Sequence, residues 1–588
     1  MKNIFKFLVL MLVITSCDDV FEPAIENIRD LDAMDKEPAY AQGILANAYI
    51  LLPYSSNPGS DVATDNAVSN DINNYYLAMA TGSWSSQSNP LSQWEGRQNA
   101  IQYINLFLER TDEVLYSQNE AINTMFNDRL KGEAYALRAL HMYYLLLAHG
   151  GWSDDGRLLG TTIRTEPETA VSNFNVPRNT FQECVNQMFA DIDMAIDLLP
   201  LDYGDIGDSE IPEKYKSLGV TNAGDYNRAN GNHIRGRISG RIIEAVKAQI
   251  ALLAASPAYQ AGTDIGYEDA AGYAALVLNR INGVAGLDMN GNTWYSNDDI
   301  DNLDAGVAPS EIIWRSTMES SNELEKENFP PSLFGNGRIN PTQNLVDAFP
   351  MRNGYPISDV SYDPENPYFN RDPRLEKYIV LNESEQGSGD EVIVTGTYSN
   401  NSNGLNKDNG YSTRTGYYLR KLLRSDCNPD PEFNTEQKHY TARIRYTEIF
   451  LAYAEAANEA WGPTGTGGAS SYSAYDVVKA IRQRAGIDSD DLYLESIKSD
   501  QDMMRELIRN ERRIELCFEN HRFWDLRRWK VADLNETARG MQIDKVDGKL
   551  IFTPIDVETR NYKPYMYHGP IPYGEIQKWS ALEQNAGW

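Results

Sequence analysis

The chain has 588 residues, of which 41% are hydrophobic and 23% charged, and its mean hydropathy is −0.50. These values are ordinary for a globular protein and exclude both a disordered chain and an integral membrane protein. With 84 acidic against 53 basic residues the formal charge is −31, which disfavours binding to nucleic acid or to an anionic lipid surface. Tyrosine is abundant, at 35 residues against 17 Phe and 10 Trp, and its apolar face and polar tip suit half-wet surfaces.

The N-terminus has the pattern of an export signal. Lys2 and Lys6 flank the start of an apolar run over residues 7–14, and small residues follow directly before Cys17. The run is too short to span a bilayer, which needs about 20 apolar residues, so residues 1–16 are predicted to be a signal peptide. The residues before Cys17 look like the site at which a bacterial lipoprotein is cleaved and acylated. Cys17 is therefore predicted to carry lipid, with residues 17–35 as a tether; the alternative is a plain secretory signal with a coincidental cysteine.

Helical periodicity dominates the first half of the chain and returns near its end. Apolar residues recur at three- and four-residue steps, and Thr180 with Glu183 forms a capping box. Between the helical stretches, residues 283–440 are rich in Gly, Asn, Asp, Ser and Pro, which predicts a loop-rich insert with a short strand at 392–394 and a buried strand around Trp314. The predicted helices are 39–51, 94–114, 128–149, 180–199, 241–255, 270–279, 443–461, 474–484 and 503–519.

Paired amphipathic helices rich in Ala, Leu and Tyr predict a mostly α fold of tetratricopeptide-like helical hairpins. No strict 34-residue period is present, so the repeats are expected to be degenerate. Most tyrosines in these helices, such as Tyr144 and Tyr453, are expected to serve helix packing.

Enzymatic motifs are missing from the sequence. The six histidines form no HExxH and no compact metal triad, and neither a GxSxG elbow nor a GxxxxGK[ST] loop occurs. The acidic run 298–301 could bind structural calcium, but it lacks the Gly and terminal Glu of an EF-hand, and a solvated acidic loop is the favoured interpretation. No cofactor, no metal site and no enzymatic activity are therefore predicted.

The remaining cysteines, Cys184, Cys427 and Cys517, are odd in number and widely spaced, so they predict no disulfide framework. Cys184 and Cys517 fall within predicted amphipathic helices and are expected to be buried thiols.

The stretch ERRIELCFENHRFWDLRRW at residues 511–529 alternates Arg and Glu with large apolar residues. On a helix, Ile514, Cys517 and Phe518 would be buried while Arg and Glu pair at i,i+3 and i,i+4, and Trp524 and Trp529 would offer faces for Arg. This pattern predicts a structural lock rather than a catalytic site.

The same stretch resembles the most characteristic motif of the SusD/RagB family of outer-membrane nutrient-binding lipoproteins. Further segments resemble that family in the expected order along nearly the whole chain. They are EAYALRA at 133–139, PTQNLVDAFPMRNG at 341–354, NRDPRL at 370–375, TGYYLRK at 415–421, RYTEIFLAYAEA at 445–456, and the ending from PIP at 570–572 to QNAGW at 584–588.

This resemblance implies one SusD-like domain over residues 36–588, with about four tetratricopeptide-like units. The helical scaffold would comprise about 36–282 and 441–530, the irregular part about 283–440 would carry the ligand surface, and 531–588 would close the domain. The implied function is non-enzymatic glycan binding at the cell exterior, on a lipid-anchored outer-membrane protein that delivers glycan to a SusC-like TonB-dependent transporter. A surface glycoside hydrolase and a structural adhesin are the alternatives.

The family motifs do not mark the ligand site, so contact residues are predicted from chemistry. Sugars are held by exposed aromatic planes, with polar side chains on their hydroxyl groups, which points to aromatic residues in polar, loop-like stretches. Each could equally be a loop anchor packed on the helices. The predicted glycan-binding residues are Asp65, Asn66, Tyr75, Tyr76, Trp84, Trp294 and Tyr295.

Overall fold

The structure is a computed structural model that describes residues 34–296, 300–303 and 306–588. The predicted signal peptide, Cys17 and nearly all of the predicted tether lie outside the described residues, as do the first two residues of the acidic run 298–301. Within the described ranges, no helix combines the length and the apolar character that crossing a membrane requires.

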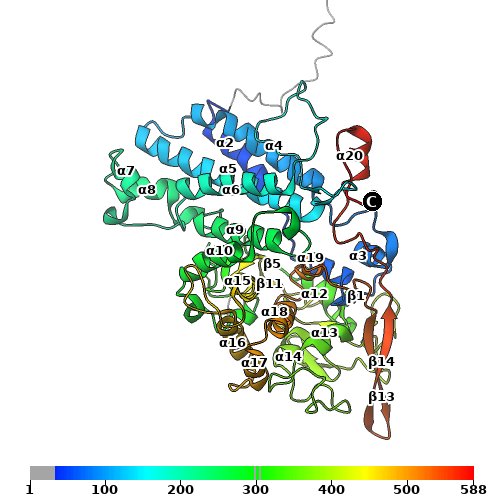
Figure 1. Ribbon diagram of the computed structural model, residues 1–588. Helices are drawn as coiled ribbons and strands as arrows, with labels where there is room; N and C mark the ends of the chain where they lie inside the picture. The colour runs from blue at the N-terminus through cyan, green and yellow to red at the C-terminus, as the bar shows by residue number, and fades with distance from the viewer. Residues whose placement is uncertain (1–33, 297–299, 304–305) are drawn as a thin grey trace, which may run out of the picture.

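A stack of antiparallel helices forms one half of the molecule (Figure 1). Each helix packs on the next: α2 on α4, α4 on α5, α5 on α6, α6 on α9 and α9 on α10. This series confirms the tetratricopeptide-like, mostly α fold, while the number of about four repeats stays a prediction. The helices are α2 (Pro38–Ile50), α4 (Trp94–Arg110), α5 (Glu120–His149), α6 (Phe181–Leu198), α9 (Gly240–Ala255) and α10 (Tyr267–Asn279), with the shorter α3 (Tyr75–Ala78), α7 (Glu213–Lys216) and α8 (Ala223–Asn230).

A second group of helices continues the stack in the other half. Helix α15 packs against α10 on one side and against α16 and α18 on the other. The group comprises α15 (Tyr446–Trp461), α16 (Ala474–Ala485), α17 (Leu492–Ile497), α18 (Gln501–Glu515) and α19 (Arg522–Arg528).

Three predicted helix boundaries were wrong, each for a local reason. Helix α5 begins at Glu120 rather than at residue 128, because the Asn119 side chain caps the backbone N–H of Ile122. Helix α15 begins only at Tyr446, because the preceding residues pair as a strand. Helix α18 ends at Glu515 rather than at residue 519, and Phe518 then adopts a φ of 64°.

The irregular half is built from short helices and two-stranded antiparallel pairs, as the composition of residues 283–440 predicts. The predicted strand at 392–394 is present one residue earlier, and Trp314 is buried in a strand as predicted. The pairs are β1 (Ala67–Ser69) with β6 (Ile339–Pro341), β4 (Ile312–Arg315) with β12 (Ala442–Arg445), β5 (Glu319–Ser321) with β11 (Gln437–His439), β7 (Ile379–Val380) with β10 (Tyr418–Leu419), and β8 (Ser384–Gln386) with β9 (Glu391–Ile393); the helices are α12 (Glu323–Asn328), α13 (Gln343–Ala348) and α14 (Arg374–Tyr378).

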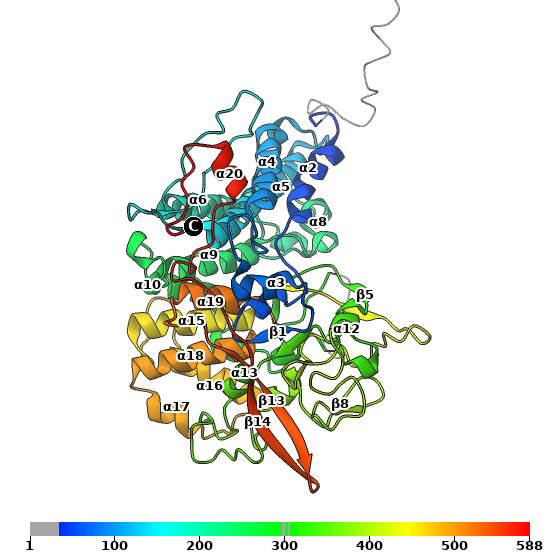
Figure 2. The ribbon, with the colours of Figure 1, turned by 90° about the vertical axis from the view of Figure 1, so that its right-hand side faces the viewer.

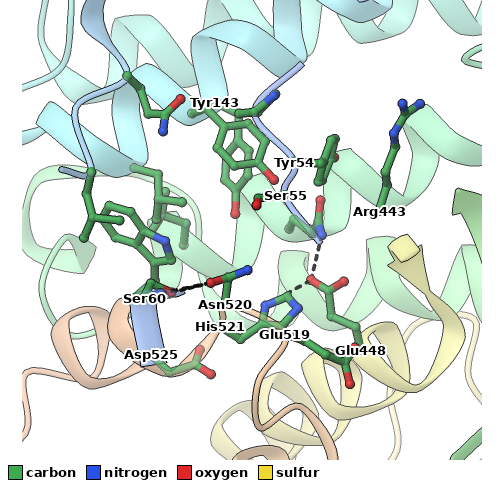
Figure 3. A pocket seen from close by; sticks show the side chains of 18 of the residues that line it. Tyr54, Ser55, Ser60, Tyr143, Arg443, Glu448, Glu519, Asn520, His521 and Asp525 are labelled. Carbon is green, nitrogen blue, oxygen red and sulfur yellow. Dashed lines mark hydrogen bonds and ion pairs between the residues drawn. The ribbon is translucent and has the colours of Figure 1, made fainter. Parts of the chain in front are cut away.

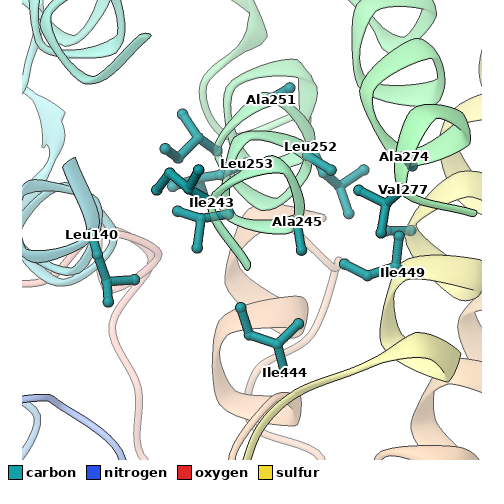
Figure 4. Close-up of a cluster of buried hydrophobic side chains, with 14 of the residues drawn as sticks. Leu140, Ile243, Ala245, Ala251, Leu252, Leu253, Ala274, Val277, Ile444 and Ile449 are labelled. Atoms are coloured by element: carbon teal, nitrogen blue, oxygen red, sulfur yellow. The ribbon is translucent and has the colours of Figure 1, made fainter. Parts of the chain in front are cut away.

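Two hydrophobic cores correspond to the two halves. The larger core lies between the stacked helices, where small and branched side chains of α9, α10 and α15 interdigitate (Figure 4). Ala245, Ala251 and Ala274 are among the residues that let these helices approach closely. The smaller core lies under the irregular half and receives Ile514, Cys517 and Phe518, so the prediction that these three residues are buried is confirmed.

The C-terminal segment returns to the helical half. A long hairpin of β13 (Ala538–Val546) and β14 (Lys549–Glu558) projects from the molecule (Figure 2). The chain then runs through α20 (Tyr573–Lys578) to a tail whose Asn585 accepts a hydrogen bond from Arg178 and donates to the carbonyl of His149. Near the end of α5, β2 (Gly151–Trp152) pairs with β3 (Leu158–Leu159).

Candidate functional site

A buried ion network lies at the centre of the conspicuous motif. Glu515 accepts hydrogen bonds from Arg374 and Arg484, both at 3.0 Å. Glu511 accepts from Arg374 at 2.9 Å and from Arg482 at 2.8 Å. The network joins five cations to six carboxylates, all less than 10% exposed: Arg374, Lys421, Arg445, Arg482 and Arg484, with Glu311, Asp372, Asp491, Glu511, Glu515 and Glu519.

This network corrects one part of the sequence interpretation. The motif's glutamates do not pair within their own helix. Their partners come from α14, from α16, from the last residue of β12 and from Lys421, which follows β10. A single helical sequence cannot indicate pairs formed between distant segments. Burial alone would raise the pKa of Glu515, but the charges of Arg484, Arg374 and Arg445 hold it well below its ordinary value. The guanidinium groups of Arg509 and Arg528 lie over the Trp529 ring, 5.0 and 4.9 Å from its centroid, as predicted. The corresponding prediction for Trp524 is not confirmed by a contact among the described residues.

The chain leaves the network through a strained turn. Phe518 and Asn520 have φ values of 64° and 63°, a region that bulky side chains rarely adopt. Glu519, between them, accepts hydrogen bonds from Arg445 and Lys421. Cys517, which the sequence placed inside a helix, lies at the start of this turn with its thiol buried.

Directly beside this turn is a cavity of about 200 Å³, which we call the central cavity. It lies between the α5 and α9 helices on one side and the 519–528 segment on the other (Figure 3). Half-buried aromatic side chains line it, chiefly Tyr54, Tyr76, Tyr143, Tyr144 and Trp524.

Polar side chains converge on the same cavity. Glu448 accepts a hydrogen bond from Gln249 at 2.6 Å, and Ser60 donates to Asn520 at 2.7 Å (Figure 3). Arg512 donates through Nε to Asp525, while its Nη1 is buried without a hydrogen-bond partner in the described structure. The cavity therefore offers aromatic faces together with amide, hydroxyl and carboxylate groups.

Two carboxylates that line the central cavity, Asp525 and Glu519, are poorly suited to proton donation. Burial alone would raise the pKa of Asp525, but Arg512 and Arg528 lower it to about 2. The pKa of Glu519 is likewise below its ordinary value, since Arg445 and Lys421 outweigh the effect of burial. A general acid in glycoside hydrolysis needs a raised pKa, and neither of these two groups has one.

A smaller cavity of about 50 Å³ lies on the other side of the same turn. Trp294, Tyr295 and Tyr440 line it together with Glu519 and Asn520. The Trp294 ring contacts the Tyr295 and Tyr440 rings at centroid distances of 5.5 and 5.4 Å. Its indole N–H is buried without a partner in the described structure.

Three of the predicted sugar-contact residues are tied into the protein interior. Asp65 receives two hydrogen bonds from Arg522 and pairs with Arg513. Asn66 is fully buried and bonds Asp61 and Arg513. Trp84 is 5% exposed and donates to Asn89; its ring packs edge-on against Phe523, Tyr562 and Trp588. These side chains present no free face.

The other four predicted residues divide between the cavities and the surface. Tyr76 lines the central cavity, and Trp294 and Tyr295 line the smaller one, though Trp294 is only 4% exposed. Tyr75 is 78% exposed on the outer surface. The seven residues therefore do not form one cluster.

The sequence criterion missed most of the central cavity. It sought aromatic residues in polar loops, whereas Tyr143 and Tyr144 lie on a long helix and Trp524 lies within the lock motif. The available signal was the 519–528 segment itself, where Asn, His, Trp and Asp stand together.

Comparison with known proteins places the chain in a family. Residues 310–588 match the model of the SusD family, and residues 31–210 match a model described as starch-binding associating with outer membrane. The chain is a SusD-like protein.

Individual relatives agree with this membership. A SusD-like protein of Formosa agariphila is 29% identical over 160 residues, which are 27% of this chain and 26% of that relative, so the match spans about a quarter of its length. A crystal structure of a SusD-like protein from Bacteroides fragilis superposes with a TM-score of 0.71 and 23% identity over 96% of this chain and 100% of its own. The structure of a SusD-like carbohydrate binding protein from the same species superposes with a TM-score of 0.67 and 19% sequence identity. The match covers 94% of this chain and 100% of that protein's chain.

Proposed function

We propose that this SusD-like protein binds an oligosaccharide or polysaccharide in the central cavity. The observation that carries the proposal is the convergence of half-buried aromatic faces with amide, hydroxyl and carboxylate groups in one cavity. Sugar rings pack their C–H faces on aromatic planes, and their hydroxyl groups bond such polar side chains. The starch-binding family description and the carbohydrate-binding relative support this ligand class.

The ionised carboxylates of the central cavity favour glycan binding without hydrolysis. The lowered pKa values of Asp525 and Glu519 keep both groups ionised, and Glu448 is engaged by Gln249. Release of reducing ends from a panel of polysaccharides by the purified protein would contradict a purely binding role.

We also propose that Cys17 carries the lipid anchor at the exterior face of the outer membrane and that the captured glycan passes to a SusC-like TonB-dependent transporter. The family membership and the family description support both steps. Affinity purification of the tagged protein from native membranes should recover such a barrel. A Cys17→Ala variant should be lost from the membrane fraction, and its retention there would contradict the anchor.

The binding site is tested by removing one aromatic face. Trp524→Ala should weaken binding to the best polysaccharide of a calorimetric panel at least tenfold, equivalent to about 1.4 kcal/mol. Trp579→Ala removes a half-buried tryptophan far from the cavity and should leave affinity unchanged. Tyr75→Ala tests the exposed residue that the sequence favoured. If Trp524→Ala folds normally and binds like the unmodified protein, the central cavity is not the site.

A further inference from the structure

A cluster of three chemically different side chains lies in the irregular half, next to the smaller cavity, which one of them, His439, helps to line. Glu325 comes from α12, Cys427 from the loop that precedes β11, and His439 from β11 itself. One potential ligand atom from each, a carboxylate oxygen, the sulfur and a ring nitrogen, all lie within 4.8 Å of one another. Glu325 precedes Cys427 and His439 by about 100 residues, so no local spacing in the sequence indicates the complete cluster.

The surroundings of the cluster orient its donor atoms. His439 Nδ1 lies 2.9 Å from the carbonyl of Gln437, and Nε2 lies 3.0 Å from Glu325 Oε1. A histidine held through one ring nitrogen by a backbone carbonyl presents the other nitrogen in a fixed direction, as metal-binding histidines do. Glu325 is fully buried, and its Oε2 has no hydrogen-bond partner in the described ranges. A buried, unsatisfied carboxylate oxygen is costly unless a further ligand engages it.

We propose that Glu325, Cys427 and His439 form a binding site for a divalent transition metal ion, with Zn²⁺ as the best match. Thiolate, imidazole and carboxylate are the three ligand types that Zn²⁺ takes in proteins. One thiolate and one carboxylate balance its charge, which a buried site requires. With ligand bonds of about 2.0–2.3 Å, tetrahedral donors lie about 3.3–3.7 Å apart, so the cluster needs only a small contraction.

The cluster also has a route to solvent and a permissive charge environment. Cys427 lines an open cavity of about 430 Å³, which gives an ion an entry path. The nearby guanidinium of Arg424 is already paired with Asp301 and Asp426 and does not add an uncompensated positive charge. An ion at this position would fasten α12, the 427–436 loop and β11 to one another and leave a fourth coordination position for water.

The site is tested on the purified chain after treatment with chelator. Calorimetric titration with Zn²⁺ alone should show one bound equivalent and a rise in melting temperature. Cys427→Ser and His439→Gln should each weaken binding at least tenfold, whereas Cys184→Ser, which removes a buried thiol of the helical half, should keep the full equivalent. If the unmodified protein binds no Zn²⁺, or if Cys427→Ser binds Zn²⁺ as tightly as the unmodified protein, the proposed site is wrong. Glu325 and His439 then form an ion pair only.

Absorption spectroscopy of the unmodified protein tests the cysteine ligand even if the variants fail to fold. Co²⁺ bound to the unmodified protein should give the thiolate-to-metal charge-transfer absorption of a cysteine ligand. Circular dichroism of each metal-free variant monitors folding. If the unmodified protein binds Co²⁺ without that absorption, Cys427 is not a ligand and the proposed site is wrong.

Discussion

Neutralising Glu515 should expose the energetic role of the buried ion network. Glu515→Gln removes the charge that accepts two hydrogen bonds at 3.0 Å from Arg374 and Arg484. Hydrogen bonds to charged groups contribute about 1.5–3 kcal/mol each, which gives about 3–6 kcal/mol and agrees with about 3–5 kcal/mol for breaking a buried pair. Arg484 would suffer most, because its remaining carboxylate, Glu311, is 3.5 Å away and its Nε has no partner in the described structure.

The size of the protein determines how far this loss of stability should shift the melting temperature. An unfolding entropy of about 2.1 cal/mol/K per residue gives about 1.2 kcal/mol/K for 588 residues, so the melting temperature in scanning calorimetry should fall by about 3–5 °C. Glu506→Gln on the same helix is the control, because this glutamate is 73% exposed and pairs only with Arg509; it should shift melting by less than about 1 °C.

A double-mutant cycle isolates the interaction itself. Adding Arg484→Met to Glu515→Gln removes both partners, so the combined loss should be smaller than the sum of the two single losses by about 1–3 kcal/mol. If Glu515→Gln melts within 1 °C of the Glu506→Gln control, or if the cycle is additive, the network does not stabilise the fold in the way argued.

Two further predictions concern pH. Burial lowers the pKa of His149 to about 4. As the pH falls, the imidazole is therefore protonated in the unfolded chain before it is protonated in the folded protein. The neutral, buried histidine contributes about 3 kcal/mol to the free energy of unfolding above pH 6.5, and this contribution is lost toward pH 4. His149→Gln should flatten the stability curve in that window, while the exposed His233→Gln should not, and parallel curves for all three proteins would contradict this. Burial raises the pKa of Asp61 to about 6, so the ionised carboxylate costs the folded state up to about 3 kcal/mol above pH 6. Asp61→Asn should therefore unfold at higher denaturant concentration than the unmodified protein at pH 7.5 but not near pH 4; equal midpoints at pH 7.5 would refute the assignment.

Local signals in the sequence predicted the helical half well. The Thr180 capping box is present where expected, and α5 ends at His149, as the predicted helix 128–149 does, because caps and apolar periodicity depend on neighbours within a few residues. For the irregular half, the sequence predicted a loop-rich composition but not which segments pair. Its strand pairs, such as β1 with β6, join segments about 270 residues apart, and no local pattern encodes such pairing.

The candidate site was less predictable for a related reason. Trp84 and Asp65 lie in a polar stretch of sequence, and only the fold shows that Phe523 and Arg522 cover them. Tyr144 has the periodicity of a packing residue, yet it also lines the central cavity. Whether an aromatic ring is a core residue or a binding surface depends on what packs opposite it, and that partner is distant in sequence.

The lock motif and the proposed binding site are connected through one turn. Glu519 and Asn520 line both the central cavity and the smaller one, and the positive φ values on either side of Glu519 are costly for non-glycine residues. That conformation persists because Arg445 and Lys421 hold Glu519 while Ser60 and Asn57 hold Asn520. The buried charges therefore do more than stabilise the fold, since they fix the wall that separates the two cavities. A variant that loosens Glu519, such as Lys421→Met, should weaken glycan binding without touching the ligand, and calorimetry with the same polysaccharide measures that loss. Unchanged affinity in a folded Lys421→Met protein would show that the network and the site act independently.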